Sequence, residues 1–170
     1  MGSEYRLLFL NFAVINIYFF GLYNSSQIKG NPIMILIMFG IAEAFGILFG
    51  EKLLHQVVSN ASLAMAVSLV IILGMNTYIK YGDLSENAVL IFFLIFVFFI
   101  GNAFNLIFTV QAEQINPKLI GIAFEINYSF GQITTMACPI IAKMDEPYPT
   151  IYCSFLCIFA ILLMASMSPP

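Results

Sequence analysis

Two carboxylates stand inside long apolar stretches of this sequence, Glu43 in the run IAEAFG and Glu125 in the run AFEINYSF. A charge at membrane depth costs at least about 2.5–3.5 kcal/mol, so such residues face a bundle interior, a cavity or a partner. One interpretation is a substrate or proton site, and the other is a protonated or hydrogen-bonded Glu that holds helices together. The sequence leaves both open for Glu43 and favours the packing role for Glu125.

Polar side chains recur at helical spacing in two of the apolar stretches, so each set shares one face of a helix. The first set is Asn102, Asn105, Thr109 and Glu113. The second set is Glu125, Ser129, Gln132 and Thr135. In a transporter such faces line the substrate pathway, whereas in any membrane bundle they provide interhelical hydrogen bonds of about 0.6 kcal/mol each. The spacing predicts the shared faces and leaves their role open.

The remaining reactive residues form no pattern typical of catalysis or metal binding. Cys153 and Cys157 lie one helical turn apart, but a lone pair of cysteines without a nearby His is a poor metal site. Cys138 has no paired framework, and His55, the only His, has no evident Ser or Asp partner. A phosphate-binding glycine loop and a nucleophile elbow are absent from the sequence. We therefore expect no enzyme activity, no metal and no cofactor.

Composition shows what kind of elements must position these residues. Of 170 residues, 61% are hydrophobic and only 9% are charged, against about 25% charged in an average soluble domain. The mean hydropathy of +0.97 leaves too little polar surface for a water-soluble globule. No basic run is present, so nucleic acid is not an expected partner. The composition indicates an integral membrane protein in contact with membrane lipids.

The apolar stretches are long enough for membrane helices, which need about 20 apolar residues to cross about 30 Å of hydrocarbon. Six stretches qualify, at about 7–27, 32–54, 61–79, 87–112, 118–142 and 148–167. Helix breakers separate them, among them Gly-Asn-Pro at 30–32 and Asn-Pro-Lys at 116–118. Since alternating strand patterns are absent, we predict an all-α bundle of six membrane helices, one domain over 1–170, with both termini on one side.

Two further patterns bear on packing and orientation. Ala42, Gly46 and Gly50 recur every four residues, which predicts a small-residue face for close helix packing. The six Lys and Arg residues divide equally between the two predicted sides of the membrane, so charge gives no orientation.

Short motifs along the chain resemble the organic cation/anion transporter family of the major facilitator superfamily. The run FFGLYNSSQIKGNPIMILIMFGIAEAFG at 19–46 resembles its seventh and eighth helices, through Gly-Leu at 21–22, Gly-Asn at 30–31 and Glu43. The run NAFNLIFTVQAEQINP at 102–117 resembles the tenth helix, and FGQITTMACPI at 130–140 resembles the eleventh. The resemblance implies that the chain corresponds to helices seven to twelve, with both termini on the inner side.

The departures from that family all concern charges that serve gating or transport. The family's arginine-rich loop after the eighth helix is EKLLHQ at 51–56, and the charged position of the eleventh helix is the neutral Gln132. The arginine expected after Pro117 is missing from the run KLIG, and the basic residue expected early in the tenth helix is missing from LIFFLIFVFFIG. The packing motifs survive.

The family's first six helices have no counterpart in this sequence, although transport requires a path between two halves that rock against each other. The loss of the gating charges favours a transporter-derived structural or accessory subunit of a larger membrane complex. The alternative is a half-transporter that moves small organic ions after pairing with a second six-helix half, and a 170-residue excerpt of a longer transporter also remains open. We expect the plasma membrane for a transporter and an organelle inner membrane, such as the mitochondrial one, for a subunit.

Overall fold

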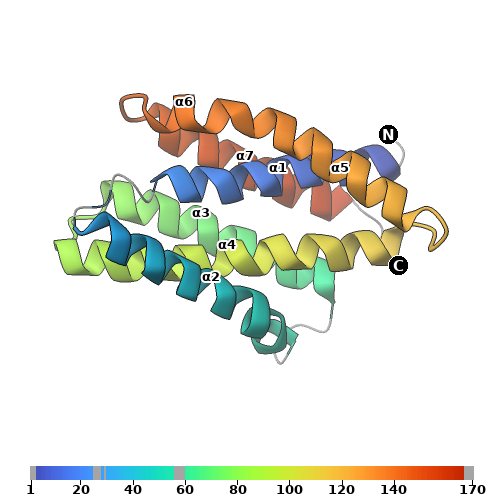
Figure 1. Ribbon diagram of the computed structural model, residues 1–170, viewed down its shortest axis with the longest axis horizontal. Coiled ribbons are helices and arrows are strands. Elements are labelled where there is room, and N and C mark those ends of the chain that lie inside the picture. Colours follow the sequence, from blue (N-terminus) through green and yellow to red (C-terminus); the bar gives the residue numbers. More distant parts are fainter. Residues whose placement is uncertain (1–2, 25–27, 29, 56–59, 167–170) are drawn as a thin grey trace.

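The computed structural model describes residues 3–24, 28, 30–55 and 60–166, and among them it contains helices and no strand. The helices run roughly along the long axis of the molecule (Figure 1). Their bounds are α1 Ser3–Asn24, α2 Pro32–His55, α3 Ala61–Tyr81, α4 Glu86–Gln114, α5 Ile120–Thr134, α6 Cys138–Ala142 and α7 Tyr148–Ser166. A single 3-10 turn, η2 (Thr135–Ala137), joins α5 to α6.

Five of these helices, α1, α2, α3, α4 and α7, are long and apolar enough to cross a membrane. The observed bounds of α2, α3, α4 and α7 lie within two residues of the predicted spans, as far as the described residues extend. The first helix begins at Ser3, four residues before the predicted start, because helical hydrogen bonding extends beyond the apolar run. The predicted residues 25–27 and 167 lie outside the described part of the chain.

The prediction of one unbroken membrane helix over 118–142 is wrong, so a count of six such helices is not confirmed. Instead α5, η2 and α6 follow one another along one side of the bundle (Figure 1). The break precedes Pro139, which has no N–H to donate and whose ring clashes with the carbonyl four residues earlier. The start also shifts to Ile120, because residues 116–119 form a turn in which the Leu119 N–H donates to the Asn116 carbonyl.

Local capping explains where three helices begin. The Asn31 side chain accepts a hydrogen bond from the Ile33 N–H at 3.0 Å, and Pro32 takes the first helical position of α2. Asn60 and Ser85 cap α3 and α4 in the same way, by accepting from the backbone N–H groups of Ser62 and Ala88. The breaker at 30–32 therefore acts as predicted.

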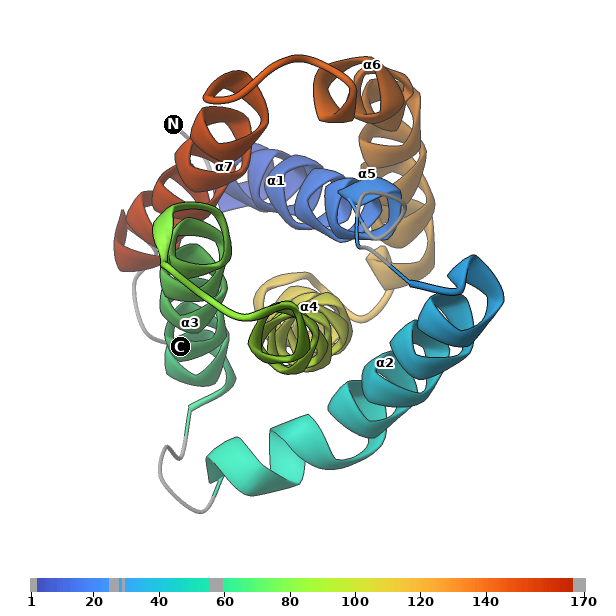
Figure 2. The same ribbon diagram turned by 90° about the vertical axis from the view of Figure 1, so that its left-hand side faces the viewer.

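α1 and α4 occupy the centre of the bundle when it is viewed end-on (Figure 2). The share of buried residues is 56% in the membrane-length part of α1 and 22% in that of α2, which packs mainly on α4. α3 packs on α4 and α7, while α5, α6 and α7 pack on α1. The Arg6 guanidinium donates to the Ser166 carbonyl, so the start of α1 and the end of α7 lie at the same end of the bundle.

Candidate functional site: polar side chains within the bundle

α2 and α4 are in near backbone contact through glycines. A Cβ added to Gly46 would overlap the Phe98 carbonyl, and one added to Gly101 would lie 2.8 Å from the Glu43 carbonyl oxygen. A Cβ added to Gly50 would lie 2.5 Å from the amide oxygen of Asn102. Approach this close requires small residues at the crossing. The predicted small-residue face of the second helix is confirmed.

Asn102, the first residue of the α4 polar set, lies inside this crossing and lines no open path. Its side chain is fully buried, and its amide N–H donates to the Ser68 hydroxyl of α3 at 2.8 Å. Ser68 in turn donates to the Ala64 carbonyl of its own helix at 3.0 Å. Asn102 therefore joins α4 to α3 in the structure while Gly50 of α2 packs against it.

Exposure increases along the rest of that set. Asn105 and Thr109 are half-buried, and Glu113, the residue before the last one of α4, is exposed. The four residues thus share a face that runs from the bundle interior toward one end of the molecule.

Glu43 is half-buried and accepts a hydrogen bond from the Tyr18 hydroxyl of α1 at 2.7 Å. The Tyr18 ring stacks on Phe104 with ring centroids 4.9 Å apart, and Phe104 contacts Phe108 edge-on. Phe108 makes an edge contact with Phe124 of α5. These five residues, all half-buried, form a surface that we call the open face. In Figure 2, α5 lies beside α1 and α2 lies beside α4, both on the right-hand side of this central pair.

The polar set on α5 points away from the bundle. Asn127 and Gly131 form the buried side of this helix, where a Cβ on Gly131 would overlap Ile15 of α1. Glu125 and Ser129 are exposed and Gln132 is half-buried. At 100° per residue these three lie on the side of α5 opposite Asn127. We call Glu125, Ser129 and Gln132 the outer polar face.

A buried polar network that sequence reasoning missed is centred on Asn16 of α1, which is fully buried. Its amide N–H groups donate to the Phe12 carbonyl at 2.7 Å and to the Thr134 hydroxyl at 2.7 Å. Its amide oxygen accepts from the Tyr152 hydroxyl at 3.1 Å and from the Cys138 thiol at 3.4 Å. One side chain thus joins α1, α5, α6 and α7. The available signal was an Asn within an apolar run, since a buried amide needs partners.

α3 and α7 are joined by a second polar cluster that the sequence did not reveal. The Asn76 amide donates to the Thr150 carbonyl at 3.3 Å, and Lys80 forms an ion pair with Glu146 at 2.9 Å. Burial alone raises the pKa of Glu146, but hydrogen bonds from Lys80 and Thr150 and the Lys80 charge outweigh it and lower that pKa. The stabilisation from this pair is therefore present above the ordinary Glu pKa and is lost as the pH falls through the lowered one.

Gln111 of α4 is buried with no hydrogen-bond partner for either atom of its amide. An unsatisfied buried amide costs about 1–3 kcal/mol, so we expect Gln111→Leu to raise the free energy of unfolding by about 1–2 kcal/mol. Asn102→Leu is the control, because the Asn102 amide N–H does have a partner, the Ser68 hydroxyl, although its amide oxygen has none, and losing that hydrogen bond should destabilise the protein. Thermal unfolding of both variants in detergent, followed by circular dichroism, measures their stability. A Gln111→Leu variant less stable than the unmodified chain would contradict the prediction.

The three cysteines are buried and unpaired, and no three His, Cys, Asp or Glu side chains come together as a metal site within the described ranges. Glu51 and His55, which the sequence comparison placed in an altered gating loop, have side chains outside the described part, and Gln56 lies outside it altogether.

Comparison of the chain with protein-family models, curated proteins and solved structures finds no match. The resemblance to the transporter family therefore stays a prediction that rests on the motifs alone. What the structure supports directly is an all-helical chain with several long apolar helices, compatible with an integral membrane protein.

Proposed function

We propose that this chain is an integral membrane protein that serves as a structural or accessory subunit of a larger membrane complex. The observation that carries the proposal is the outer polar face of α5. Hydrocarbon cannot satisfy an amide or a hydroxyl, and a carboxylate at membrane depth is more costly still. Glu125, Ser129 and Gln132 lie on the outward side of their helix, so they need partners that the described residues of this chain do not provide there.

The exterior of α2 provides the contrast. Its exposed side chains are large and apolar over most of its length, as on a helix that faces lipid. They are Ile33, Met34, Leu36, Ile37, Ile41, Phe45, Leu48 and Phe49. A partner protein is therefore expected on the outer polar face and the adjoining open face, while lipid is expected on the far side of α2.

In this proposal the stretch α5–η2–α6 is a sixth, interrupted membrane crossing. A broken helix is tolerated in a membrane where nearby hydroxyls satisfy the freed backbone groups. The Thr134 hydroxyl donates to the Gly131 carbonyl at 2.6 Å, and the Thr135 hydroxyl donates to the Gln132 carbonyl at 2.7 Å. Residues 120–142 are together long enough to cross, at about 1.5 Å per residue.

The second candidate function is the half-transporter, with the open face completed by a second six-helix half. The position of Glu43 favours this candidate. Its carboxylate, hydrogen-bonded to Tyr18, is half-buried on the open face, where it would contact the second half and any solute between the two halves. Both candidates derive the chain from a transporter and differ in whether the assembled complex moves a solute. An organelle inner membrane suits the subunit, and the plasma membrane suits the transporter.

We expect the purified chain, reconstituted alone in liposomes, to show no saturable uptake of organic cations or anions. Alternating access needs two conformational states of similar energy that substrate binding can bias. One six-helix half without the opposite half does not have these two states. Glu43→Gln should leave the function of the native complex intact and at most loosen the assembly. Saturable uptake that Glu43→Gln abolishes would make the half-transporter the better account.

The outer polar face gives the complementary measurement. We expect the chain carrying Glu125→Leu, Ser129→Leu and Gln132→Leu to lose its partner subunits when it is purified under mild conditions from its own membrane. The matched control changes three exposed residues of α2 conservatively, with Ile33→Leu, Ile37→Leu and Ile41→Leu, and should keep those subunits. Native gel electrophoresis shows whether each variant retains its partner subunits. Equal retention by the two variants would count against the proposed interface.

A further inference from the structure

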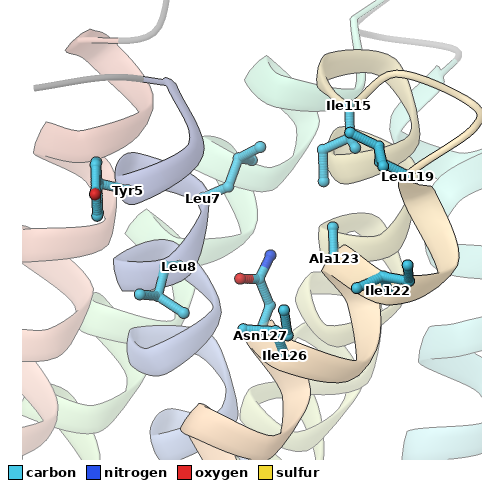
Figure 3. Close-up of a pocket in the computed structure, with 9 residues that line it drawn as sticks. All are labelled: Tyr5, Leu7, Leu8, Ile115, Leu119, Ile122, Ala123, Ile126 and Asn127. Atoms are coloured by element: carbon cyan, nitrogen blue, oxygen red, sulfur yellow. The ribbon is translucent and has the colours of Figure 1, made fainter.

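A cavity of about 290 Å³ lies between the start of α1, the end of α4 and the first two turns of α5 (Figure 3). Its rim carries exposed side chains, among them Tyr5, Ile122 and Ile126, so it opens toward the outside of the bundle. Its base carries the buried Leu7 and Asn127. Apart from Tyr5 and Asn127, the lining side chains are aliphatic.

Asn127 is the feature that distinguishes this cavity from a packing defect. Its side chain is 7% exposed, and its amide points into the cavity from α5 (Figure 3). Unlike Asn16 and Asn102, it forms no side-chain hydrogen bond with another described residue. One N–H donor group and one carbonyl acceptor are thus presented to whatever fills the cavity.

α4 adds a second unsatisfied amide on this side of the bundle. Gln111 precedes the lining residue Ile115 by one turn, so the two side chains project from the same face of the helix. Both polar atoms of Gln111 are buried without a partner. Gln111 is not among the residues that line the cavity, so the amide of Asn127 alone indicates a missing polar group there, since polar side chains with little exposure rarely lack a partner.

We propose that this cavity binds a lipid-soluble small molecule that carries a single carbonyl or hydroxyl group on a hydrocarbon body. The aliphatic walls hold the hydrocarbon, and the Asn127 amide hydrogen-bonds the polar group. An apolar cavity of about 150 Å³ admits benzene, so this one has room for a molecule about twice that size. Ligand sites with these properties are mostly apolar with few, well-placed polar groups.

The depth of Asn127 separates a free molecule from the acyl chain of a bilayer lipid. Asn127 is eight residues after Leu119 at the polar turn, which places it about 12 Å along the helix from that turn at about 1.5 Å per residue. The ester carbonyls of a phospholipid stay near the membrane surface, and the deeper part of its chains has no polar group. A molecule that enters from the hydrocarbon with its polar group toward α5 therefore fits this site.

The test uses the full chain in phosphatidylcholine nanodiscs and a ten-carbon ketone that carries a photoreactive diazirine. Mass spectrometry should locate the crosslinks in residues 5–8 and 115–127. Decanol should protect against labelling at about a three- to tenfold lower mole fraction than decane, since only decanol can hydrogen-bond Asn127. Equal protection by the two competitors would overturn the proposal.

Variants assign the effect to particular side chains. Asn127→Leu should abolish the advantage of decanol over decane, and Ala123→Phe should fill the cavity and remove the labelling. Tyr128→Phe, which removes a hydroxyl one residue away outside the cavity, should behave as the unmodified chain. If Asn127→Leu does not fold, the comparison of decanol with decane and the Ala123→Phe variant still decide the question.

Two other results would overturn the proposal. One is an advantage of decanol that Asn127→Leu leaves unchanged. The other is labelling of residues 115–127 by a phospholipid with a diazirine in its acyl chain, to the exclusion of the ketone, which would identify the occupant as a bilayer lipid.

Discussion

Replacing Gly46 by Ala should lower the free energy of unfolding by about 3 kcal/mol or more and separate α2 from α4. The added Cβ would overlap the Phe98 carbonyl, and a backbone atom of a neighbouring helix cannot move aside as a flexible side chain does. Overpacking in a close-packed interior commonly costs about 1–3 kcal/mol, and a clash with backbone lies at the upper end. Because α2 packs mainly on α4, few other contacts compensate.

Gly40→Ala is the matched control for this change. It lies on the same helix with no atom within 4 Å of the added Cβ, so it should be neutral or stabilise α2 by up to about 1 kcal/mol. Thermal unfolding of both variants in detergent, followed by circular dichroism, measures the difference. Equal stability of Gly46→Ala and Gly40→Ala would show that the two helices are not in backbone contact.

Replacing Asn16 by Leu should destabilise the bundle by about 2–4 kcal/mol, although Leu is the more apolar residue. The change leaves the half-buried Tyr152 hydroxyl without its acceptor, while the Cys138 thiol keeps only its contact with the backbone carbonyl of residue 16, at 3.6 Å. A buried donor that loses its only partner retains the full cost of desolvation. Thr134 is less affected, since its hydroxyl also donates to the Gly131 carbonyl.

A double-mutant cycle makes the Asn16 prediction specific. Tyr152→Phe removes the orphaned hydroxyl, so adding it to Asn16→Leu should restore about 1 kcal/mol or more of stability. Asn11→Leu is the matched control, because Asn11 is about equally buried on the same helix but, among the described residues, its side chain bonds only the Leu7 carbonyl one turn earlier, at 3.3 Å. If Asn11→Leu and Asn16→Leu lower the free energy of unfolding equally, the hydrogen bonds from Asn16 to other helices add no stability of their own.

Helix existence and most helix ends were predictable because they depend on local properties. Apolar length identifies α2, α3, α4 and α7, and the Asn-Pro sequence at 31–32 begins α2 through a hydrogen bond within two residues. The same measure failed at Pro139, since apolar length takes no account of a missing backbone donor. It counted a broken segment as one helix.

The direction of each polar face was not predictable, because helical spacing fixes which residues share a face and not where that face points. Asn102 and Glu125 are both polar residues at regular intervals in apolar helices. The rotation of α4 buries the first against α3, and the rotation of α5 turns the second outward. Packing between distant segments sets those rotations, and the same holds for the pairing of Glu43 with Tyr18.

The contact between Tyr18 and Glu43 has a consequence for the order in which the chain is built. A ribosome delivers α1 and α2 to the membrane before any of α4 exists, so the small-residue face of α2 has no partner helix at that stage. Tyr18 and Glu43, only 25 residues apart, are already both present. Their hydrogen bond gives the newly inserted carboxylate an immediate partner, although α1 and α2 otherwise make few contacts with each other. α4 arrives later and packs on both α1 and α2, so most of the contacts between these parts of the chain form only at that stage.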